Sequence, residues 1–344
     1  MKKIYIKTTE SCNLCCDHCY IGEARKNKKF FDEDTTTAWL KEYMKIHGLR
    51  NSDLYISFHG GEPLLCHLEK IEKVCKAFPG AQIDATTNLE YELTNDILVF
   101  MKTYFVSDGH FFVKTSWDKD IRFKVKGQES LWWENIKKLK NEGAYIKVNI
   151  CLTTKLLEMA EKDFLIYFSG PEIDEIHFER LTFDTTQDKT LIPDYKKVDR
   201  WLLNLYKLNP EIEIDNFTDI KRALKKEFVG CRNRRCMKDV ITINADGSVG
   251  GCPNSSLSAS YTSIYEKPKL TYDKQEALVK KEELRNLACY ACEYFSVCNG
   301  DCCQLSFYHG ECPFPKNLAK AIKIRQKLHR IVVFADFLLP LLSF

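Results

Sequence analysis

The chain of 344 residues is long enough for one large domain and a smaller second one, and its 44% hydrophobic content can supply a substantial core. Lys and Arg number 51 against 48 Asp and Glu, and the resulting net charge of +3 gives no electrostatic basis for binding nucleic acid or an anionic membrane. Because no secretory signal follows Met1, we expect a cytoplasmic protein, in which 16 cysteines indicate metal binding or thiol chemistry rather than structural disulfides.

Residues 2 to about 182 alternate between short β-rich runs and segments of helical periodicity, which predicts repeated βα units around a parallel sheet. The first helix illustrates the signals, because Asp32 or Asp34 can cap its start and Gly48 suits its end. The expected fold class is therefore α/β, with six such units. Their strands are expected at 3–8, 54–58, 82–87, 111–116, 145–152 and 175–181.

After the sixth strand the composition changes. Residues 194–208 and 221–226 predict helices that leave the parallel sheet, and the chain becomes rich in loops from Cys231 onward. Residues 241–249 predict a β-hairpin around Ala245-Asp246-Gly247. The expected divisions are 1–200 for the βα domain, 201–230 for a helical linker, 231–318 for a cysteine-rich domain and 319–344 for a C-terminal helix.

The last residues, 331–344, are strongly apolar, but Asp336 and Pro340 interrupt them. They are also fewer than the roughly 20 residues that a helix needs to span a bilayer, so we expect no membrane span. The expected structure is a helix packed on the body of the protein. Docking to a membrane surface or to a partner protein is the alternative.

A cysteine motif follows the first strand. Cys12, Cys16 and Cys19 have the spacing C-x3-C-x2-C, and Cys15 is an extra cysteine within it. Three thiolates on one tight loop can bind three irons of a four-iron cluster and leave the fourth iron open to an amino and a carboxylate group. Chance spacing in a cysteine-rich chain and a zinc site are the alternatives, although zinc prefers a fourth protein ligand.

This loop, followed by the aromatic Tyr20, resembles that of the radical S-adenosylmethionine (SAM) superfamily. The resemblance implies a partial (β/α)6 barrel in which Cys12, Cys16 and Cys19 bind a catalytic 4Fe–4S cluster. It also implies that this cluster reductively cleaves SAM to a 5′-deoxyadenosyl radical, which abstracts a hydrogen atom from the substrate.

Further motifs at the ends of the strands resemble SAM contacts of this superfamily. Gly60-Gly61-Glu62-Pro63 is similar to the GGEP motif that binds the methionine amino group, and its glycines permit close approach of the backbone to the ligand. Ser116 and Asp118 resemble an S-x-D motif with Ser116 as a candidate ribose contact, and Thr86-Thr87-Asn88 is a weaker match. A simple turn, ordinary packing or surface pairing are the alternatives. The candidate SAM-binding residues are Gly60, Gly61, Glu62, Pro63, Ser116, Asp118, Asn149 and Arg180, where Asn149 and Glu179-Arg180 come from strands that could face the barrel interior.

The C-terminal cysteines resemble those of a SPASM domain, which is found on radical enzymes that modify peptides and proteins. Eight thiolates suffice to close two auxiliary 4Fe–4S clusters, and a zinc ribbon is the alternative. The resemblance implies an inner cluster bound by Cys231, Cys236, Cys252 and Cys302, and an outer cluster bound by Cys289, Cys292, Cys298 and Cys312. Cys66, Cys75 and Cys151 are expected to be ordinary buried cysteines, while Cys15 and Cys303 stand beside ligands.

Within the superfamily the chain resembles peptide maturases and anaerobic sulfatase maturases most. In the sulfatase maturases an Asp, understood as the catalytic base, follows the last cysteine of the G-x4-C motif, whereas Pro253 follows Cys252 here. This departure puts formylglycine formation in doubt and leaves the catalytic residues unknown. Because the first barrel strand is expected to start at residue 3, we also expect no winged-helix segment of the kind that binds the leader peptide in many peptide maturases.

The expected activity is radical modification of a peptide or protein side chain by hydrogen abstraction, with oxidative crosslinking of a ribosomally made peptide as the first hypothesis. The expected cofactors are SAM and three 4Fe–4S clusters, one catalytic and two auxiliary. The expected partners are the substrate, a low-potential electron donor such as flavodoxin or ferredoxin, and a separate leader-recognition protein if leader binding is supplied elsewhere. Radical oxidation of a small molecule is the second hypothesis, and a non-catalytic electron-transfer or metal-binding protein is the third.

Overall fold

The computed structural model describes residues 1–183, 186–227, 230–305, 307, 308 and 310–338, with side chains as far as residue 328. The strands are β1 (Lys2–Thr9), β2 (Leu54–Gly60), β3 (Gln82–Ala85), β4 (Val106–Ser107), β5 (His110–Ser116), β6 (Tyr145–Leu152), β7 (Glu175–Arg180), β8 (Glu213–Ile214), β9 (Val240–Ile243), β10 (Ser248–Gly250) and β11 (Thr262–Ser263). The α-helices are α1 (Glu33–His47), α2 (Leu68–Ala77), α3 (Asn95–Tyr104), α4 (Gln128–Asn141), α5 (Thr154–Leu157), α6 (Glu161–Tyr167), α7 (Tyr195–Lys207), α8 (Asp215–Leu224), α9 (Cys236–Asp239), α10 (Asp273–Glu283), α11 (Leu287–Tyr290), α12 (Phe295–Cys298) and α13 (Lys316–Leu338). Short 3₁₀ helices are η1 (Gly22–Lys26), η2 (Asn51–Asp53), η3 (Pro63–Leu65), η4 (Lys189–Leu191) and η5 (Gly230–Asn233).

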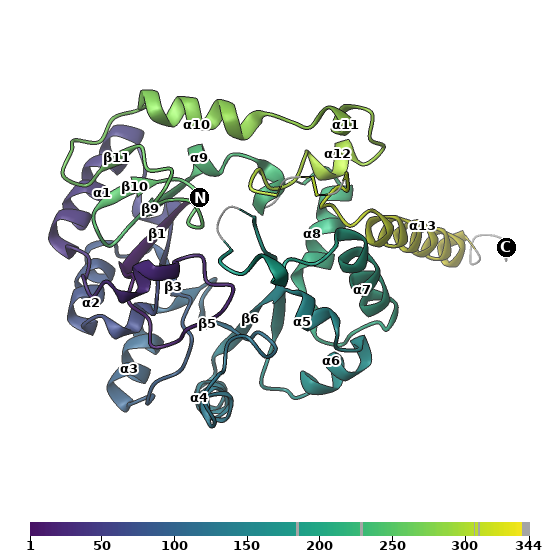
Figure 1. Cartoon of the computed structure of the whole chain (residues 1–344), viewed down its shortest axis with the longest axis horizontal. Helices are drawn as coiled ribbons and strands as arrows, with labels where there is room; N and C mark the ends of the chain where they lie inside the picture. The colour runs from purple at the N-terminus through teal and green to yellow at the C-terminus, as the bar shows by residue number, and fades with distance from the viewer. Residues whose placement is uncertain (184–185, 228–229, 306, 309, 339–344) are drawn as a thin grey trace.

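One curved sheet of 11 strands organises the described chain, in the order β11-β10-β9-β1-β2-β3-β4-β5-β6-β7-β8 (Figure 1). Strands β1 to β3 and β5 to β8 run parallel to their neighbours, whereas β4 is antiparallel to β3 and β5. Helices α1 to α7 lie around the outside of the arc (Figure 1). The predicted α/β partial barrel is confirmed, and all six predicted strands are present. The two-residue β4 was not predicted, because it is too short to show a period.

The cysteine-rich region extends the sheet of the barrel. Strand β9 pairs in parallel with β1, with Ile241 opposite Ile4, and β10 returns antiparallel to β9 through the predicted hairpin. Helix α10 then runs along the top of the view in Figure 1, from the side of β11 to the short helices α11 and α12. The expected boundary at residue 200 falls inside α7. The division into domains remains a prediction.

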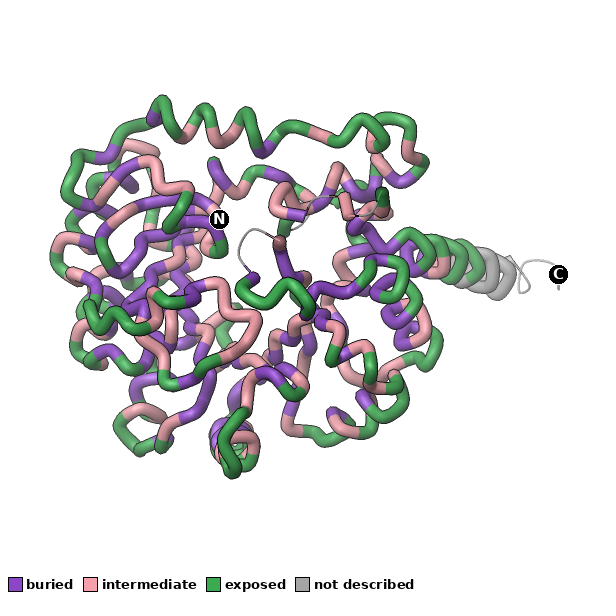
Figure 2. Tube along the Cα trace, in the orientation of Figure 1, coloured by how far each residue is buried: buried purple, intermediate pink, exposed green. Residues whose placement is uncertain are grey.

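The two faces of the strands separate the hydrophobic core from the barrel interior. In β6, Ile146, Val148 and Ile150 are buried in the core, and the alternate residues Lys147 and Asn149 point to the other face and are half-buried. Buried segments accordingly follow the strands and the inner sides of the helices in Figure 2. The interior face is therefore the polar one.

Ion pairs line this interior face. Lys114 of β5 contacts the completely buried Asp84 of β3, and Lys147 of β6 contacts Glu175 of β7 and Asp215 at the start of α8. Burial by itself would raise the pKa of Asp84, but Lys114 outweighs it and holds this pKa below its usual value. The barrel interior is therefore built to surround polar groups.

Helix α13 begins on α7. The carboxylate of Asp199 accepts hydrogen bonds from the backbone N–H groups of Asn317 (2.9 Å) and Leu318 (3.0 Å), which caps the first turn. Leu318 and Ile322 are buried, whereas Ile324 is 50% exposed. The helix continues away from the barrel (Figure 1). The expected packing on the body is thus present at the start of the helix.

The side chains of the apolar stretch 331–344 lie outside the described residues, so their expected packing stays a prediction. Within the described part of the chain, every helix is too short or too polar to cross a lipid bilayer.

Replacing Asp199 by Ala should lower the free energy of unfolding by about 1–2 kcal/mol, because two first-turn N–H groups lose their acceptor. Chemical denaturation followed by circular dichroism measures this value. Asp199→Asn, which keeps an acceptor oxygen, should lose less. Equal stability of the Ala variant and the parent chain would contradict the capping role.

Candidate active site

The cysteine loop leaves the C-terminal end of β1, on the rim where parallel barrels place their active sites. The thiols of Cys12, Cys16 and Cys19 are close enough to one another for their charges to interact, and Cys15 is exposed. Burial raises the pKa of Cys16 to about 12, so metal binding there must displace a proton. His18 contacts Asp118. Because Cys15 is exposed and His18 is held by Asp118, the remaining three thiols fit a four-iron cluster with one open iron.

The Gly60-Gly61 turn at the end of β2 lies directly against this loop. The N–H of Gly61 donates to the carbonyl of Thr9, and the N–H of Glu62 donates to the carbonyl of Ser11, both at 2.9 Å. A Cβ atom on Gly61 would lie only 2.1 Å from the Ser11 carbonyl oxygen. Gly60 has a φ of 130°, which also favours glycine. The glycines were expected to let the backbone approach a ligand, but the close neighbour that excludes a side chain here is the cysteine loop itself.

Glu62 directly follows the Gly60-Gly61 turn and is completely buried. Its carboxylate links this turn to the residues that follow β3. Its carboxylate accepts hydrogen bonds from Leu64 N–H (3.1 Å), the Thr87 hydroxyl (2.8 Å) and Asn88 N–H (2.6 Å). Burial raises the pKa of Glu62 to about 7. The predicted contact between Glu62 and the methionine amino group remains a prediction.

Asn88 is the residue through which this network reaches the cysteines. Its side-chain amide donates to Asn13 Oδ1 at 2.7 Å and approaches the Cys12 sulfur at 3.6 Å. The Cys12 sulfur also accepts a hydrogen bond from Leu14 N–H at 3.4 Å. Hydrogen bonds to ligand sulfurs help to set the reduction potential of an iron–sulfur cluster. Asn88 was noted in the sequence only as part of a weak match, because a single amide carries no spacing signal.

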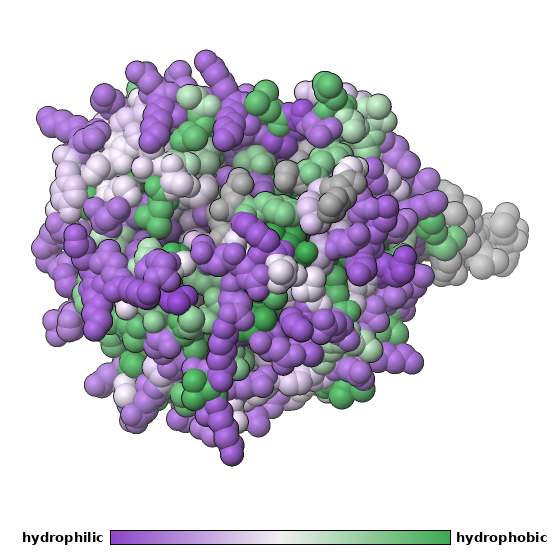
Figure 3. Space-filling model, in the orientation of Figure 1, coloured by the Kyte–Doolittle hydropathy of each residue, from purple (hydrophilic) through white to green (hydrophobic). Residues whose placement is uncertain are grey.

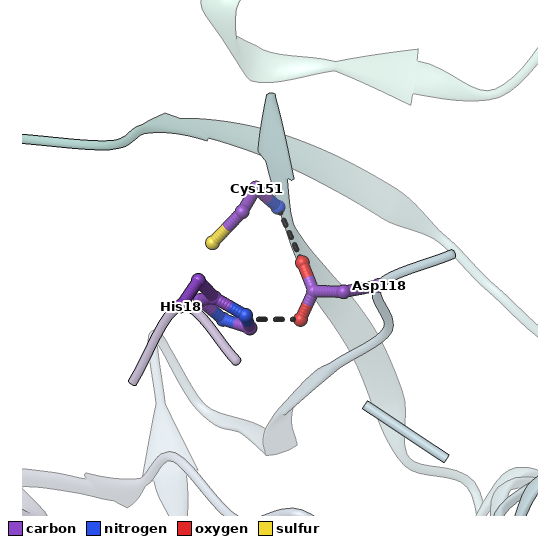
Figure 4. A group of neighbouring side chains, drawn as sticks. All are labelled: His18, Asp118 and Cys151. Carbon is purple, nitrogen blue, oxygen red and sulfur yellow. Dashed lines mark hydrogen bonds and ion pairs between the residues drawn. The ribbon is translucent and has the colours of Figure 1, made fainter. Parts of the chain in front are cut away.

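Asp118 organises the other side of the loop (Figure 4). Its carboxylate accepts hydrogen bonds from Cys151 N–H (2.7 Å) and Arg122 Nε (2.8 Å), and His18 Nε2 lies 3.5 Å away. The His18, Asp118 and Cys151 side chains form a group with the residue types of a metal site. However, the guanidinium of Arg122 already pairs with the carboxylate of Asp118. This positive charge would repel a cation bound there. The group therefore positions His18 within the cysteine loop.

The other predicted SAM contacts lie on the same rim or just below it. Ser116 and Asn149 are register partners on β5 and β6 and are both half-buried on the interior face. Pro63 is buried, and its carbonyl accepts a hydrogen bond from the Thr8 hydroxyl at 2.9 Å. The structure thus brings Gly60 to Pro63, Ser116, Asp118 and Asn149 to the rim and interior of one barrel. Their role in binding SAM remains a prediction.

The cysteines expected at the inner auxiliary cluster lie together. The thiol of Cys231 is within hydrogen-bonding reach of the thiols of Cys236 and Cys302, and Cys252 is near both Cys236 and Cys302. Cys303 also contacts Cys302, so the extra cysteine is a close neighbour of this set. Four thiols from separate loops fit a fully ligated cluster.

The cysteines expected at the outer auxiliary cluster line one small pocket. Its walls include Cys289, Cys292, Cys298 and Cys312, together with aromatic residues such as Phe314. Burial raises the pKa of Cys298 to about 12. The two sets of four that the SPASM resemblance implied are therefore also the two sets that the fold assembles. The assignment of ligands to clusters remains a prediction.

Arg180, which was expected to contact SAM, instead reaches the cysteine-rich region. Its guanidinium makes two 2.8 Å hydrogen bonds to the carboxylate of Asp301 and one of 3.3 Å to the carbonyl of Pro313. Asp301 stands between one cysteine of each set, Cys298 and Cys302, and also accepts a hydrogen bond from the N–H of Cys302. Arg180 is therefore committed to holding the auxiliary cysteines against β7.

The segment held by Arg180 has an unusual backbone. Asn299, Gly300 and Asp301 all have positive φ values, of 52°, 77° and 51°. Such conformations cost energy for residues other than glycine and persist where surrounding contacts hold them. The side chain of Arg234 donates to the Gly300 carbonyl at 2.9 Å, and Asn299 donates to the Arg232 carbonyl at 2.8 Å. These contacts were not predictable, because they join segments about 70 residues apart.

Glu179 of β7 lies on the interior face, where surrounding protein desolvates it in part although its side chain keeps contact with solvent. Its side chain is 54% exposed and lies 3.1 Å from His177 Nε2, while His177 Nδ1 lies 2.6 Å from Asp215. Burial alone would raise the pKa of Glu179, but His177 lowers it to about 2. Burial alone would lower the pKa of His177, but Glu179 and Asp215 raise it to about 9. The interior therefore presents an ionised carboxylate.

Comparison with known proteins supports this description. No family model matches the chain. The uncharacterized protein MJ0907 of Methanocaldococcus jannaschii is 25% identical over 305 residues, which cover 86% of this chain and 96% of that protein. Among solved structures, anSMEcpe with bound AdoMet has a TM-score of 0.75 at 17% identity, covering 98% of this chain and 99% of that one. SuiB of Streptococcus suis has a TM-score of 0.56 at 14% identity, over 87% of this chain and 72% of that one.

These likenesses establish the fold. The chain has the radical SAM fold with a SPASM-type, cysteine-rich C-terminal region, as the sequence predicted. A further structure of anSMEcpe, with bound AdoMet (SAM) and the Cp18Cys peptide, is also similar over 98% of this chain, with a TM-score of 0.72 at 18% identity.

Replacing Gly61 by Val should displace the cysteine loop, since the new side chain would overlap the carbonyl oxygens of Ser11 and Glu10. We expect a loss of about four irons per chain from the reconstituted protein. Iron analysis with circular dichroism, to verify folding, measures this. Gly170→Val is the control, because a Cβ atom there meets only the flexible Glu172 side chain. Full iron content in the Gly61 variant would disprove the contact.

Replacing Arg180 by Gln should remove iron from the auxiliary sites while SAM cleavage remains, because the buried carboxylate of Asp301 would lose its ion-pair partner. Breaking such a pair costs roughly 3–5 kcal/mol. Arg180→Lys, which cannot make both hydrogen bonds to Asp301, should lose less iron. Arg222→Gln breaks an exposed pair with Glu227 and serves as the control. An Arg180→Gln variant with full iron content and parental stability would refute this role.

Proposed function

We propose that this chain is a radical SAM enzyme with one catalytic and two auxiliary 4Fe–4S clusters, and that it modifies a side chain of a peptide or protein. The observation that carries the proposal is the group of three thiols, Cys12, Cys16 and Cys19, at the rim of a barrel with the radical SAM fold. Three thiols leave one iron open, which is what binding of an amino acid group requires.

The resident residues would divide the work. When bound, the cluster supplies the electron that cleaves SAM and so generates the radical that abstracts hydrogen. The three cysteines hold it, the Gly60-Gly61 turn fixes the position of their loop, and Asn88 donates a hydrogen bond toward the Cys12 sulfur. Ser116 and Asn149 on the polar interior face would contact SAM.

The comparison with solved structures supports a peptide as the substrate. The similar structure of anSMEcpe contains AdoMet and the Cp18Cys peptide, and its likeness to this chain extends through the cysteine-rich region. The ionised Glu179 lies on the interior face, where it can bind a cationic group of the substrate. We propose oxidative crosslinking of a ribosomally made peptide, with the auxiliary clusters accepting the electron released.

Formylglycine formation and oxidation of a small molecule are the less favoured activities. Pro253, which has no proton-accepting side chain, follows Cys252 where the sulfatase maturases carry an Asp. The Pro253 carbonyl accepts a hydrogen bond from the Ser256 hydroxyl at 3.2 Å, so this segment forms a turn. A base for formylglycine formation would have to come from elsewhere, and its loss would cost roughly 10²- to 10⁴-fold in rate.

Replacing Cys12, Cys16 and Cys19 together by Ala should reduce the iron content from about twelve to about eight per chain and abolish SAM cleavage. Iron and sulfide analysis and chromatography of 5′-deoxyadenosine, with Ti(III) citrate as reductant, measure both effects. Cys66→Ala, at a buried cysteine outside the three groups, is the matched control. Deoxyadenosine production by the triple variant, or stoichiometric zinc in place of iron in the parent, would sink the proposed function.

A further inference from the structure

A run of basic residues follows the cysteine loop. Arg25, Lys26, Lys28 and Lys29 lie within five positions, and the three lysines are exposed. Lys26 pairs with Glu23 through a weak, fully exposed contact, whereas Arg25, Lys28 and Lys29 make no ion pair within the described part of the chain. The proposed chemistry gives these charges no role.

The run is fixed beside the cysteine loop. The Thr9 hydroxyl donates to the Lys29 carbonyl at 2.8 Å, and the N–H of Phe31 donates to the Thr8 carbonyl at 2.9 Å. Thr9 also forms an antiparallel bridge with Phe30. Since Thr9 ends β1 three residues before Cys12, the basic run cannot move away from the loop without breaking these contacts. The backbone of the run is therefore held beside the start of the cysteine loop.

Basic residues also flank the loop on its other side. Lys124 pairs with Asp17, which is adjacent to Cys16, and Lys126 is exposed without an ion pair among the described residues. The N–H of Asp17 donates to the Ile121 carbonyl at 3.3 Å, which anchors this second segment to the loop. Figure 3 shows hydrophilic side chains across this face of the molecule, interrupted by hydrophobic ones.

Exposed apolar residues lie within both basic segments. Phe30 is 38% exposed and Val125 is 66% exposed. Basic residues around a few apolar side chains are typical of a surface that meets an acidic protein, in which charge guides the encounter and apolar contacts stabilise it. The cysteine loop between the segments reaches the surface, because Cys15 is exposed and its three neighbouring cysteines are only partly buried.

We propose that residues 25–30 and 124–126 form the docking surface for an acidic electron-transfer protein of the flavodoxin class, which delivers the electron directly to the catalytic cluster. This rests on the proposed function, because only a radical SAM reaction requires an electron at this loop. A polyanion is a poorer occupant, since the charges form two short segments on either side of a loop and the net charge of the whole chain is only +3.

The outer auxiliary site offers the competing entry point. Lys274, Lys280 and Lys281 of α10 are exposed on the segment that leads to Cys289. However, they alternate with acidic residues of the same helix, such as Glu276 and Glu283, so their charge is largely balanced. Electrostatic guidance therefore favours the surface beside the catalytic loop.

Each molecule of SAM that is cleaved in the assay consumes one electron. Flavodoxin hydroquinone gives up one electron and becomes the semiquinone, and one sulfur–carbon bond of SAM breaks. The products are methionine and, after uptake of a hydrogen atom from thiol in the buffer, 5′-deoxyadenosine. No substrate peptide is needed, because this uncoupled cleavage reports electron delivery alone.

The test compares two reductants on the reconstituted full chain. The triple variant Lys26→Glu, Lys28→Glu and Lys29→Glu should lower flavodoxin-driven cleavage roughly 10- to 100-fold at low ionic strength, mostly through KM, and should remove its salt dependence. Cleavage driven by Ti(III) citrate, which needs no docking surface, should be unchanged. The matched control is Lys274→Glu, Lys280→Glu and Lys281→Glu on α10, which should have no effect with either reductant.

The possible results distinguish failure of the docking surface from failure of the proposed function. Equal flavodoxin rates for the parent and the residue 26–29 variant, or a loss confined to the α10 variant, would overturn the docking surface. It would also be overturned if neither flavodoxin nor ferredoxin supports cleavage that Ti(III) citrate supports. Absence of cleavage with every reductant would instead reject the proposed function.

Discussion

The close contact between the cysteine loop and the Gly60-Gly61 turn is the constraint on which the rest of the site depends. The turn and the loop share backbone hydrogen bonds, and the atoms of Ser11 occupy the space that a side chain on Gly61 would need. Because Glu62 follows directly, its carboxylate can bind the backbone of Asn88. The ends of β1, β2 and β3 thereby converge on the three cysteines. Residues from all three strand ends determine the surroundings of the loop.

The same barrel also fixes the cysteine-rich region. Strand β9 adds to β1 inside a single sheet, and Arg180 at the end of β7 binds Asp301 between the two auxiliary sets. In the order of the sheet, strands β2 to β6 separate these two attachments. Together they fix the inner auxiliary cysteines relative to the cysteine loop. Such rigidity suits a reaction in which a radical must reach one hydrogen atom only.

The strands, the hairpin and the cysteine spacings could be predicted from the sequence because each is a local pattern. The positions of β6 and of the three loop cysteines are examples. The contact between Arg180 and Asp301 could not be predicted, because the two residues are 121 positions apart and no periodicity marks the pair. The contacts of Asn88 with Asn13 and Cys12 could not be predicted for the same reason. The contact of Gly61 with the cysteine loop was not predicted, since a glycine pattern shows that space is short but does not say which atoms fill it.

The most direct test of the central claim, an open iron that binds SAM, is electron–nuclear double resonance on the reduced full chain. SAM labelled with ¹⁵N in the amino group and ¹⁷O in the carboxylate should give hyperfine coupling from both labels to the cluster held by Cys12, Cys16 and Cys19. The coupling should vanish when these three cysteines are replaced by Ala. An iron-loaded parent chain whose spectrum does not respond to SAM, with no coupling from either label, would contradict the account.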